Sequence, residues 1–342
     1  MQGLKEYPMF KGARAPLVIE PSMAERDLGT LVAIHRKALD ERLLEYGALL
    51  FRGFQVSTVE DFERFSTAVS PRKLDYTYRS TPRSSVGKGV FTATEYPPDQ
   101  EIAMHCENAY QRDWPLKVAF CCLQAADTGG ETPIADMRQV TAAIGGELLD
   151  LFETRKVRYV RHYRPYVDIP WNVVFQTSDR GEVASFCQRN GIDHEWLDAD
   201  TLRTAQTNHG TARHPLTGER VFFNQAHLFH VSNVGTEMAK SLINLFGPDR
   251  LPRNAYYGDG QEIASEDLQR IAQSFRAAAV SFAWHAGDVM LLDNMQMAHG
   301  RRPFTGKRRV VASLLDAYSE QVRDPVTNSK PIRAQASAAQ PS

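Results

Sequence analysis

The chain has 342 residues, a formal net charge of −1 at pH 7 and 42% hydrophobic residues. This length can bury a full hydrophobic core, and the balanced charge gives no reason to expect nucleic acid or an anionic membrane as a partner. The sequence contains neither a signal-peptide pattern nor eighteen consecutive apolar residues, so we expect a cytoplasmic protein without a membrane span. The four sparse cysteines are expected to be free thiols. No pattern indicates an oligomeric state.

The first half of the chain carries alternating helix and strand patterns. After an extended lead-in of about twenty residues, apolar residues at helical spacing predict a helix from about Glu25 to Glu45. A compact apolar strand, 47–54, and a second helix, Val59–Val69, follow. Val118–Leu123 has the composition of a buried strand, and Asp136 is a suitable N-cap for the next helix.

The second half predicts an insertion followed by further strands. Residues from about 145 to 280 are expected to form a helical insertion. Its clearest helices are predicted at Arg180–Asn190, Thr236–Phe246 and Glu266–Ala279. Strand patterns return at Val289–Asp293 and Val310–Leu315, and the polar residues 321–342 are expected to be disordered. The layout predicts one domain, 1–320, of mainly β with α class: a double-stranded β-helix (jelly-roll or cupin-like) core with a helical insertion.

His105, Glu107 and His299 are the candidate metal ligands. Residues i and i+2 of a strand point to the same side, so His105 and Glu107 can converge on one ion while Cys106 points away. Two histidines and one carboxylate hold non-haem Fe(II) on one face and leave the opposite face open. His299 must come from a distant strand, which a closed or folded-over sheet allows.

Further motifs accompany these ligands. Four sequence elements are informative when taken together. They are His105-Cys106-Glu107, Gly129-Gly130-Glu131-Thr132-Pro133, the block from Gly287-Asp288-Val289 through Asp293-Asn294 to His299-Gly300-Arg301, and Gly306-Lys307-Arg308-Arg309-Val310. Together they resemble the taurine dioxygenase-like (TauD/TfdA) family of Fe(II)- and 2-oxoglutarate-dependent oxygenases, from about residue 47 to 318. The resemblance implies a dioxygenase that uses Fe(II), 2-oxoglutarate and O₂, with the two histidines and the glutamate as iron ligands.

The resemblance also implies a site for 2-oxoglutarate. Arg309 corresponds to the second arginine of the family's Arg-Arg pair, and a planar guanidinium binds a carboxylate through two parallel hydrogen bonds. Strand alternation is expected to turn Arg308 to the opposite face. Thr132 would donate its hydroxyl to the same carboxylate, the alternative being a turn threonine with no ligand. Ser313 stands where taurine dioxygenase has the arginine that binds sulfonate, which argues against taurine as substrate.

Several segments resemble a narrower branch, typified by the syringomycin-pathway aspartyl β-hydroxylase. They are Arg79–Arg83, Thr94–Pro97, His105–Glu107, Phe175–Ser178, Asn224–His230 and Tyr257–Gly260. This resemblance implies hydroxylation of an sp³ carbon of an L-amino acid, free or tethered to a peptidyl carrier protein, in the biosynthesis of a specialised metabolite such as an antibiotic. The expected substrate-binding residues are Arg83, Asn108, Tyr110 and Gln225.

Several alternatives stay open at this point. A desaturase or cyclase would use the same hydrogen abstraction, and the substrate could be a small carboxylate other than an amino acid. A zinc hydrolase could use the same ligand types, but it would not need Arg309 and Thr132. A non-catalytic jelly-roll binding module would not need a complete ligand set. His227 and His230 lie in an apolar stretch and are more typical of core or surface histidines than of ligands.

Overall fold

The computed structural model describes residues 1–22, 26–74, 78, 83–93, 96–165 and 167–319. The expected tail, 321–342, and parts of two quoted motifs, 79–82 and 94–95, lie outside the described residues. Within the described ranges, none of the helices combines the length and the apolar composition needed to cross a membrane.

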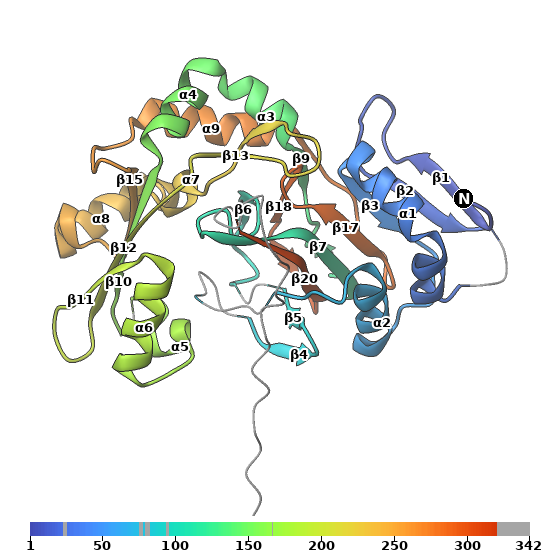
Figure 1. Cartoon of the computed structure of the whole chain (residues 1–342), viewed down its shortest axis with the longest axis horizontal. Helices are drawn as coiled ribbons and strands as arrows, with labels where there is room; N and C mark the ends of the chain where they lie inside the picture. The colour runs from blue at the N-terminus through green and yellow to red at the C-terminus, as the bar shows by residue number, and fades with distance from the viewer. Residues whose placement is uncertain (23–25, 75–77, 79–82, 94–95, 166, 320–342) are drawn as a thin grey trace, which may run out of the picture.

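An eight-stranded sheet forms one wall of the β-structure (Figure 1). Its strands, in spatial order, are β1 (Leu4–Pro8), β2 (Leu17–Pro21), β3 (Ala48–Phe51), β17 (Val289–Asp293), β7 (Asp113–Gln124), β20 (Arg309–Ser319), β5 (Val90–Thr92) and β4 (Ser85–Gly87). Neighbours pair antiparallel, except β2 and β3, which are parallel. The strands predicted from apolar runs are therefore β3, β7, β17 and β20, and the extended lead-in supplies β1 and β2.

A smaller sheet packs against the inner face of the large one. It contains β16 (Ala279–Val280), β9 (Ile134–Asp136), β18 (Met297–Arg301) and β6 (Ile102–His105). Phe120 on β7 and Val310 on β20 share one hydrophobic core with Ile134 on β9 and Met297 on β18. Short strands β8 (Thr128–Gly129) and β19 (Phe304–Thr305) pair beside them. Two sheets around one core form the jelly roll that the sequence predicted.

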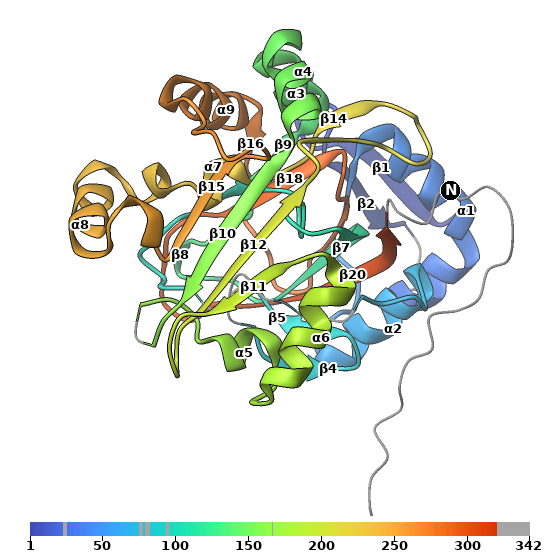
Figure 2. The ribbon, with the colours of Figure 1, turned by 60° about the vertical axis from the view of Figure 1, so that its left-hand side comes forward.

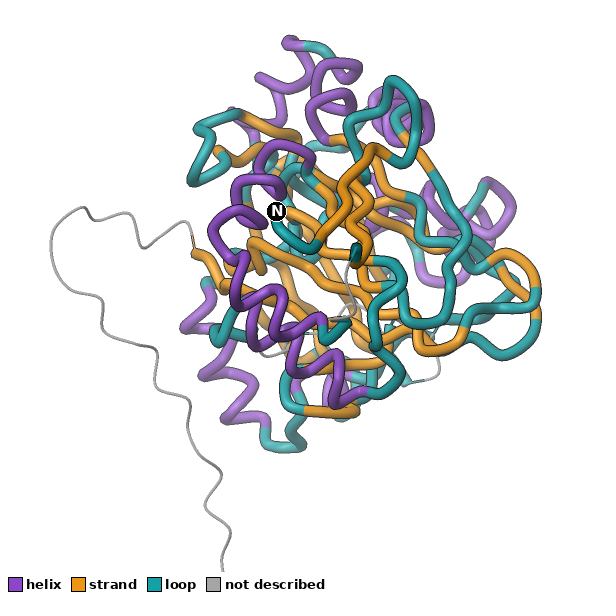
Figure 3. Tube along the Cα trace, turned by 90° about the vertical axis from the view of Figure 1, so that its right-hand side faces the viewer, coloured by secondary structure: helices purple, strands orange, loops and turns teal. Residues whose placement is uncertain are grey.

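Two helices, α1 (Leu28–Tyr46) and α2 (Val59–Val69), cover the outer face of the large sheet (Figures 1 and 3). Phe62 of α2 belongs to a second hydrophobic core with Ala119 of β7 and Val311 of β20. These strand residues alternate with Phe120 and Val310, which point inward. Each long central strand is therefore buried on both faces, which explains its nearly continuous apolar sequence.

Between β9 and β16 the chain forms an insertion of helices and strands. Its elements are α3 (Met137–Ile144), α4 (Gly146–Arg155), β10 (Val157–Tyr163), α5 (Trp171–Phe175), α6 (Arg180–Asn190), β11 (Asp193–Trp196), β12 (Leu202–Asn208), β13 (Thr211–Arg213), β14 (Arg220–Phe222), α7 (Ala226–Phe229), η1 (Val231–Val234), α8 (Thr236–Phe246), η2 (Pro248–Arg250), β15 (Arg253–Tyr257) and α9 (Ser265–Ala277). Asp136 caps α3, and the three clearest predicted helices are α6, α8 and α9. The sequence did not indicate the four-stranded antiparallel sheet β11-β12-β10-β15 (Figure 2).

Candidate active site

Two neighbouring strands of the small sheet bring the candidate histidines together. His299 on β18 pairs with His105, the last residue of β6, and their ring centroids are 4.7 Å apart. Oε2 of Glu107 lies 3.5 Å from Nε2 of His299. One ligand atom from each of the three residues lies within 4.8 Å of the other two. The structure thus brings together the three residues that the sequence singled out.

Glu107 lies in the turn that follows β6, and Asn294 holds this turn. Oδ1 of Asn294 accepts a hydrogen bond from the Glu107 N–H at 2.7 Å, while Nδ2 donates to the carbonyl of Glu107 at 2.9 Å and to that of Pro115 at 2.8 Å. The buried amide therefore fixes the backbone of the carboxylate residue. Sequence reasoning gave Asn294 no role of its own, although its place in the motif before His299 was an available signal.

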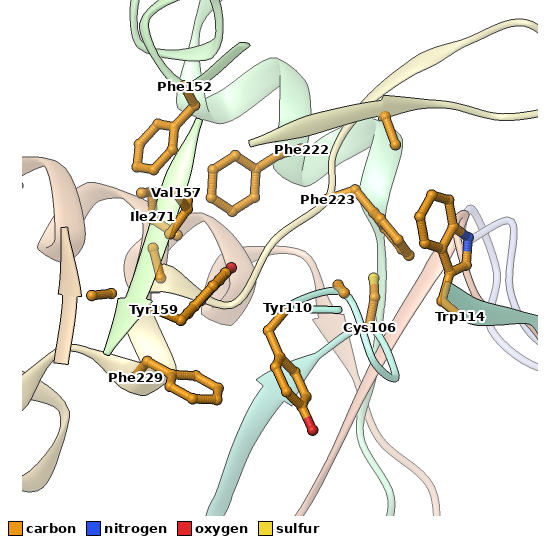
Figure 4. Close-up of a cluster of buried hydrophobic side chains, with 14 of the residues drawn as sticks. Cys106, Tyr110, Trp114, Phe152, Val157, Tyr159, Phe222, Phe223, Phe229 and Ile271 are labelled. Carbon is orange, nitrogen blue, oxygen red and sulfur yellow. The ribbon is translucent and has the colours of Figure 1, made fainter. Parts of the chain in front are cut away.

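Cys106 points away from the three candidate ligands. Its side chain belongs to the hydrophobic core that also contains Trp114 and Phe223 (Figure 4). Burial raises the pKa of the Cys106 thiol well above its usual range. The thiol is therefore a protonated core group, as expected for the residue between two that converge, and all four cysteines are free and buried.

Charges around the three residues favour a carboxylate and neutral imidazoles. Nη2 of Arg83 donates to Oε2 of Glu107 at 2.8 Å, and the two side chains are 3% and 4% exposed. Burial alone would raise the pKa of Glu107, but Arg83 and the histidines hold it well below its usual range. Burial and the neighbouring His299 lower the pKa of His105 to about 4, so its ring is neutral at pH 7.

The donor set fits Fe(II), which accepts two imidazole nitrogens and one carboxylate oxygen on one face. Nδ1 of His105 is bonded to the carbonyl of Ala103 at 2.9 Å, which leaves Nε2 available as a ligand atom. Nδ1 of His299 is buried and has no hydrogen-bond partner among the described residues. A buried polar atom of this kind normally has a partner, so the site suits a bound group.

A small inner cavity of about 30 Å³ lies beside the histidines, lined by His105, His299, Thr132 and Arg308 among others. Nε of Arg308 donates to the carbonyl of Gly130 at 2.9 Å, and no carboxylate of the described residues pairs with Arg308. Burial lowers the pKa of Arg308 to about 10, so it stays charged at pH 7. An enclosed cation without an anion is a suitable partner for a carboxylate ligand.

The orientation expected for Arg309 is therefore wrong. Arg309 is exposed, whereas Arg308 lines the inner cavity. The cause is the ordinary alternation of β20, which places every second residue on the same face of the strand. Val310 and Ala312 face the inner core, so Arg308 continues the inward-facing side of the strand.

The inward position of Arg308 also changes which residue stands four positions after the inward arginine. That residue is Ala312, not Ser313. Ser313 faces away and donates its hydroxyl to the carbonyl of Gly89 at 2.7 Å. Ala312 also lacks a charge, so the argument against a sulfonate partner at this position is unchanged.

Thr132 and the turn before it are placed by two glycines. Gly129 and Gly130 have φ of 68° and 73°, the left-handed region that favours glycine. A Cβ at Gly129 would lie 2.2 Å from the carbonyl oxygen of Pro303. Nε1 of Trp284 donates a hydrogen bond to Oγ1 of Thr132 at 3.0 Å. The Thr132 hydroxyl accepts this bond, so its own proton remains available for donation to a ligand.

An outer cavity of about 120 Å³ lies on the other side of His105. Its polar lining includes Arg83, Glu101, Glu107, Gln225, Asn233 and Arg253, and its apolar lining includes Ile102, Leu228 and Phe229. Of the predicted substrate-binding residues, Arg83 and Gln225 line this cavity. Nε2 of Gln225 donates to the carbonyl of Cys106 at 2.7 Å, so its amide orientation is fixed. Arg253 and Glu101 were not predicted, because neither lies in a motif.

Asn108 and Tyr110 are the two substrate-binding predictions that the cavities do not support. Neither residue lines the inner or the outer cavity in the described part of the chain. Asn108 is buried with φ of 56°, at the turn after Glu107. Tyr110 lies in the hydrophobic core against Tyr159 and Phe229 (Figure 4), and its hydroxyl donates to the carbonyl of Tyr78 at 2.8 Å. Both side chains therefore contribute to the fold and not to the lining of the cavities.

A larger surface cleft of about 900 Å³ adjoins the outer cavity, with which it shares Glu101, Ala103 and Asn233. His227 and His230 line this cleft and lie outside the candidate metal group. Nε2 of His227 contacts the carbonyl of Met104 at 3.0 Å, and its ring stacks on Phe275. This packing agrees with the expectation that His227 is a core histidine.

A jelly roll with two histidines and a carboxylate beside a half-buried arginine without a carboxylate partner in the described ranges has the fold and donor set of the non-haem iron oxygenases. The family model described as taurine catabolism dioxygenase TauD, TfdA family matches residues 13–315. The chain therefore belongs to this family, and it is a dioxygenase that uses Fe(II), 2-oxoglutarate and O₂.

Individual relatives agree with this assignment. The chain is 40% identical over 309 residues to dapdiamide synthesis protein DdaC from Enterobacter agglomerans, covering 90% of this chain and 93% of DdaC. It is 30% identical over 318 residues to a clavaminate synthase-like protein from Arabidopsis thaliana, covering 87% and 93%. PvcB from Pseudomonas aeruginosa has a similar structure, with a TM-score of 0.53, 17% identity and 92% of each chain covered. At that identity the similarity to PvcB concerns the fold.

Proposed function

We propose that the chain hydroxylates an sp³ carbon of an L-amino acid, as one step in the biosynthesis of a specialised metabolite. In this proposal His105, Glu107 and His299 hold the iron, and Thr132 and Arg308 hold 2-oxoglutarate. The observation that carries the proposal is the position of His105, which lines both the inner cavity with its unpaired arginine and the outer cavity with its charged and amide side chains.

Fe(II), 2-oxoglutarate and O₂ together supply the oxidation of an unactivated C–H bond. The chain supplies binding, orientation and exclusion of water. Arg308 binds the distal carboxylate of 2-oxoglutarate in the inner cavity, and Thr132 donates its hydroxyl proton to the same group. Trp284, which donates to Thr132 at 3.0 Å, orients that hydroxyl.

Arg83 takes a different role from the one that the sequence indicated. Its Nη2 is 2.8 Å from Oε2 of Glu107, and both side chains are buried. A charge-assisted hydrogen bond of this length keeps the carboxylate ionised and fixes its rotamer. We therefore propose Arg83 as a positioning residue for Glu107.

The lining of the outer cavity supports an amino acid as the substrate class. Glu101 and Arg253 offer one negative and one positive group, and Gln225 offers its carbonyl oxygen because its NH₂ group is bonded to Cys106. An amino acid carries the complementary pair of charges. The 40% identity to a protein named for dapdiamide synthesis supports a biosynthetic role.

A tethered amino acid is the second candidate, favoured by the surface cleft. The cleft holds about 900 Å³, far more than the outer cavity of about 120 Å³ that it adjoins. A substrate carried on the flexible arm of a peptidyl carrier protein could extend through it. The free and the tethered amino acid differ in size, but the chemistry at the iron is the same for both.

Mass spectrometry after anaerobic loading and exposure to O₂ tests the proposal. The protein is incubated with Fe(II), 2-oxoglutarate and a panel of L-amino acids, free and loaded on a carrier protein. A gain of one oxygen supports hydroxylation, whereas a loss of two hydrogens means desaturation or cyclisation. Oxidation of a small carboxylate that is not an amino acid, with no amino acid accepted in either form, would overturn the proposal.

A further inference from the structure

Arg253 is a cavity arginine to which no role has been given. It is the first residue of β15 and lines the outer cavity together with Phe229, whose ring centroid lies 5.7 Å from its guanidinium carbon. Its side chain is 32% exposed. The guanidinium is therefore neither buried in the core nor free on the surface, and lies where a molecule in the outer cavity can contact it.

One side of this guanidinium is held by Asp168. Nη2 of Arg253 is 2.5 Å from Oδ1 of Asp168, and Nε is 3.3 Å from Oδ2. The Asp168 side chain is 8% exposed and also lies 3.7 Å from Nη2 of the buried Arg161. Burial would raise the pKa of Asp168, but the two arginines hold it below its usual value. An ionised, nearly enclosed carboxylate thus fixes the orientation of Arg253.

The other side of the guanidinium remains available. Nε and Nη2 bind Asp168, whereas Nη1 has no hydrogen-bond partner in the described part of the chain. Nη1 and the outer N–H of Nη2 form the second edge of the planar fork. Such an edge matches the two oxygens of a carboxylate.

Among the described residues, three other arginines line the two cavities. Arg83 is bonded to Glu107, whereas Arg301 and Arg308 line the inner cavity. Of the two arginines that line the outer cavity as described, Arg253 is the one that is not bonded to a candidate metal ligand.

We propose that Arg253, oriented by Asp168, forms a carboxylate subsite in the outer cavity, and that the substrate presents a free carboxylate to the Nη1 edge. In a free amino acid this is the α-carboxylate, and in a tethered one it is a side-chain carboxylate. The inference rests on the proposed oxidation of an amino acid and adds the group by which that amino acid is recognised.

Equilibrium binding without turnover tests the subsite. The wild-type protein is loaded with Mn(II) and 2-oxoglutarate in the absence of O₂. The probes are the twenty common L-amino acids, each compared with its α-carboxamide, and for aspartate and glutamate also with the side-chain amide. We expect at least one acid to bind about 30-fold more tightly than one of its amides, because leaving one partner of a desolvated charge pair unpaired has a cost of this order.

Three variants separate the contribution of the guanidinium fork of Arg253 from that of its positive charge and from effects on the whole protein. Arg253→Gln should reduce the preference for acid over amide to less than about 3-fold. Arg253→Lys keeps the charge but loses the fork, and should retain an intermediate preference. Arg213→Gln, at an exposed arginine that lines neither the inner nor the outer cavity as described, is the matched control and should bind as wild type. Thermal unfolding and 2-oxoglutarate affinity identify any variant that has lost its fold.

The outcomes distinguish the subsite from the wider function. Equal binding of acids and amides to the wild-type protein would overturn the subsite but leave amino-acid oxidation intact. A folded Arg253→Gln protein that keeps the full preference for acids would also overturn it. Binding and oxidation of none of the amino acids, free or tethered, would overturn both proposals.

Discussion

The two cavities that meet at His105 are built from different parts of the molecule. The inner cavity is lined by the jelly roll: Phe120 on β7, His299 to Arg301 on β18, Val310 on β20 and the adjoining Thr132 and Arg308. The outer cavity takes Gln225, Leu228, Phe229, Asn233 and Arg253 from the insertion. The strands hold the groups suited to iron and 2-oxoglutarate, whereas the described residues of the insertion line only the outer of these two cavities. One scaffold can therefore keep its oxidative chemistry while the insertion changes the substrate.

The largest effect is expected at the three candidate ligands. His105 lines both cavities, His299 the inner one and Glu107 the outer one. His105→Ala, Glu107→Ala or His299→Ala should abolish O₂-dependent turnover, because each change removes one of the three donors that hold the ion on one face. Iron content per chain and product mass are the measurements. His194→Ala, on β11 and outside the candidate metal group, is the control. Full hydroxylation by Glu107→Ala would show that the triad assignment is wrong.

The next effect concerns the jelly-roll side alone. Arg308→Ala should raise the KM for 2-oxoglutarate strongly, since truncating one partner of a buried charge pair costs roughly 2–5 kcal/mol. Arg309→Ala provides the adjacent control and should have a much smaller effect, because Arg309 is exposed. The KM for the amino acid should change little in either variant. The reverse ranking of the two arginines would contradict the register of β20.

The jelly-roll side was also the more predictable from sequence. Val118–Leu123 and Val289–Asp293 are nearly continuous apolar runs because both faces of β7 and β17 are buried. The candidate triad followed from residue type and spacing together with the family resemblance. The choice between Arg308 and Arg309 did not, because it depends on which face of β20 meets the inner core, which is a tertiary feature.

The insertion was less predictable for physical reasons. β10 alternates Val157, Tyr159 and Tyr163 with polar residues, a signal that was present but weak. β12 has the mixed sequence LRTAQTN and becomes a strand through its pairing with β10 and β11. Arg253 and Glu101 lie in no motif, and their place in the outer cavity results from the packing of distant segments.

A smaller effect should appear at the residue that positions the carboxylate. Asn294→Asp keeps the oxygen that accepts from the Glu107 N–H but loses the donors to Glu107 and Pro115. We expect roughly 10- to 100-fold weaker iron affinity, as is typical when a partner that orients a ligand is changed. Iron titration of the folded variant is the measurement, with thermal unfolding alongside. Unchanged iron affinity would mean that the turn after β6 is held by the rest of the fold.

The smallest effect tests the contact between the two regions, where His227 of α7 meets β6. Nε2 of His227 is bonded to the carbonyl of Met104 at 3.0 Å, and burial lowers its pKa to about 4. In the unfolded chain a histidine titrates near pH 6.5. As the pH falls from 7 towards 5, the unfolded state therefore takes up a proton that the folded state does not, and stability is lost. The expected contribution of His227 is about 1–2 kcal/mol over this interval.

Denaturant unfolding of the metal-free protein at pH 7 and pH 5 measures the contribution of His227 to the pH dependence of stability. In His227→Gln the difference in unfolding free energy between the two pH values should be smaller than in wild type by about 1–2 kcal/mol. His194→Gln, on β11, provides a matched loss of a histidine outside the contact between α7 and β6. An unchanged pH dependence in His227→Gln would mean that the ring is hydrated or charged in the folded state. The insertion would then be less tightly packed on the jelly roll than the stacking of His227 on Phe275 indicates.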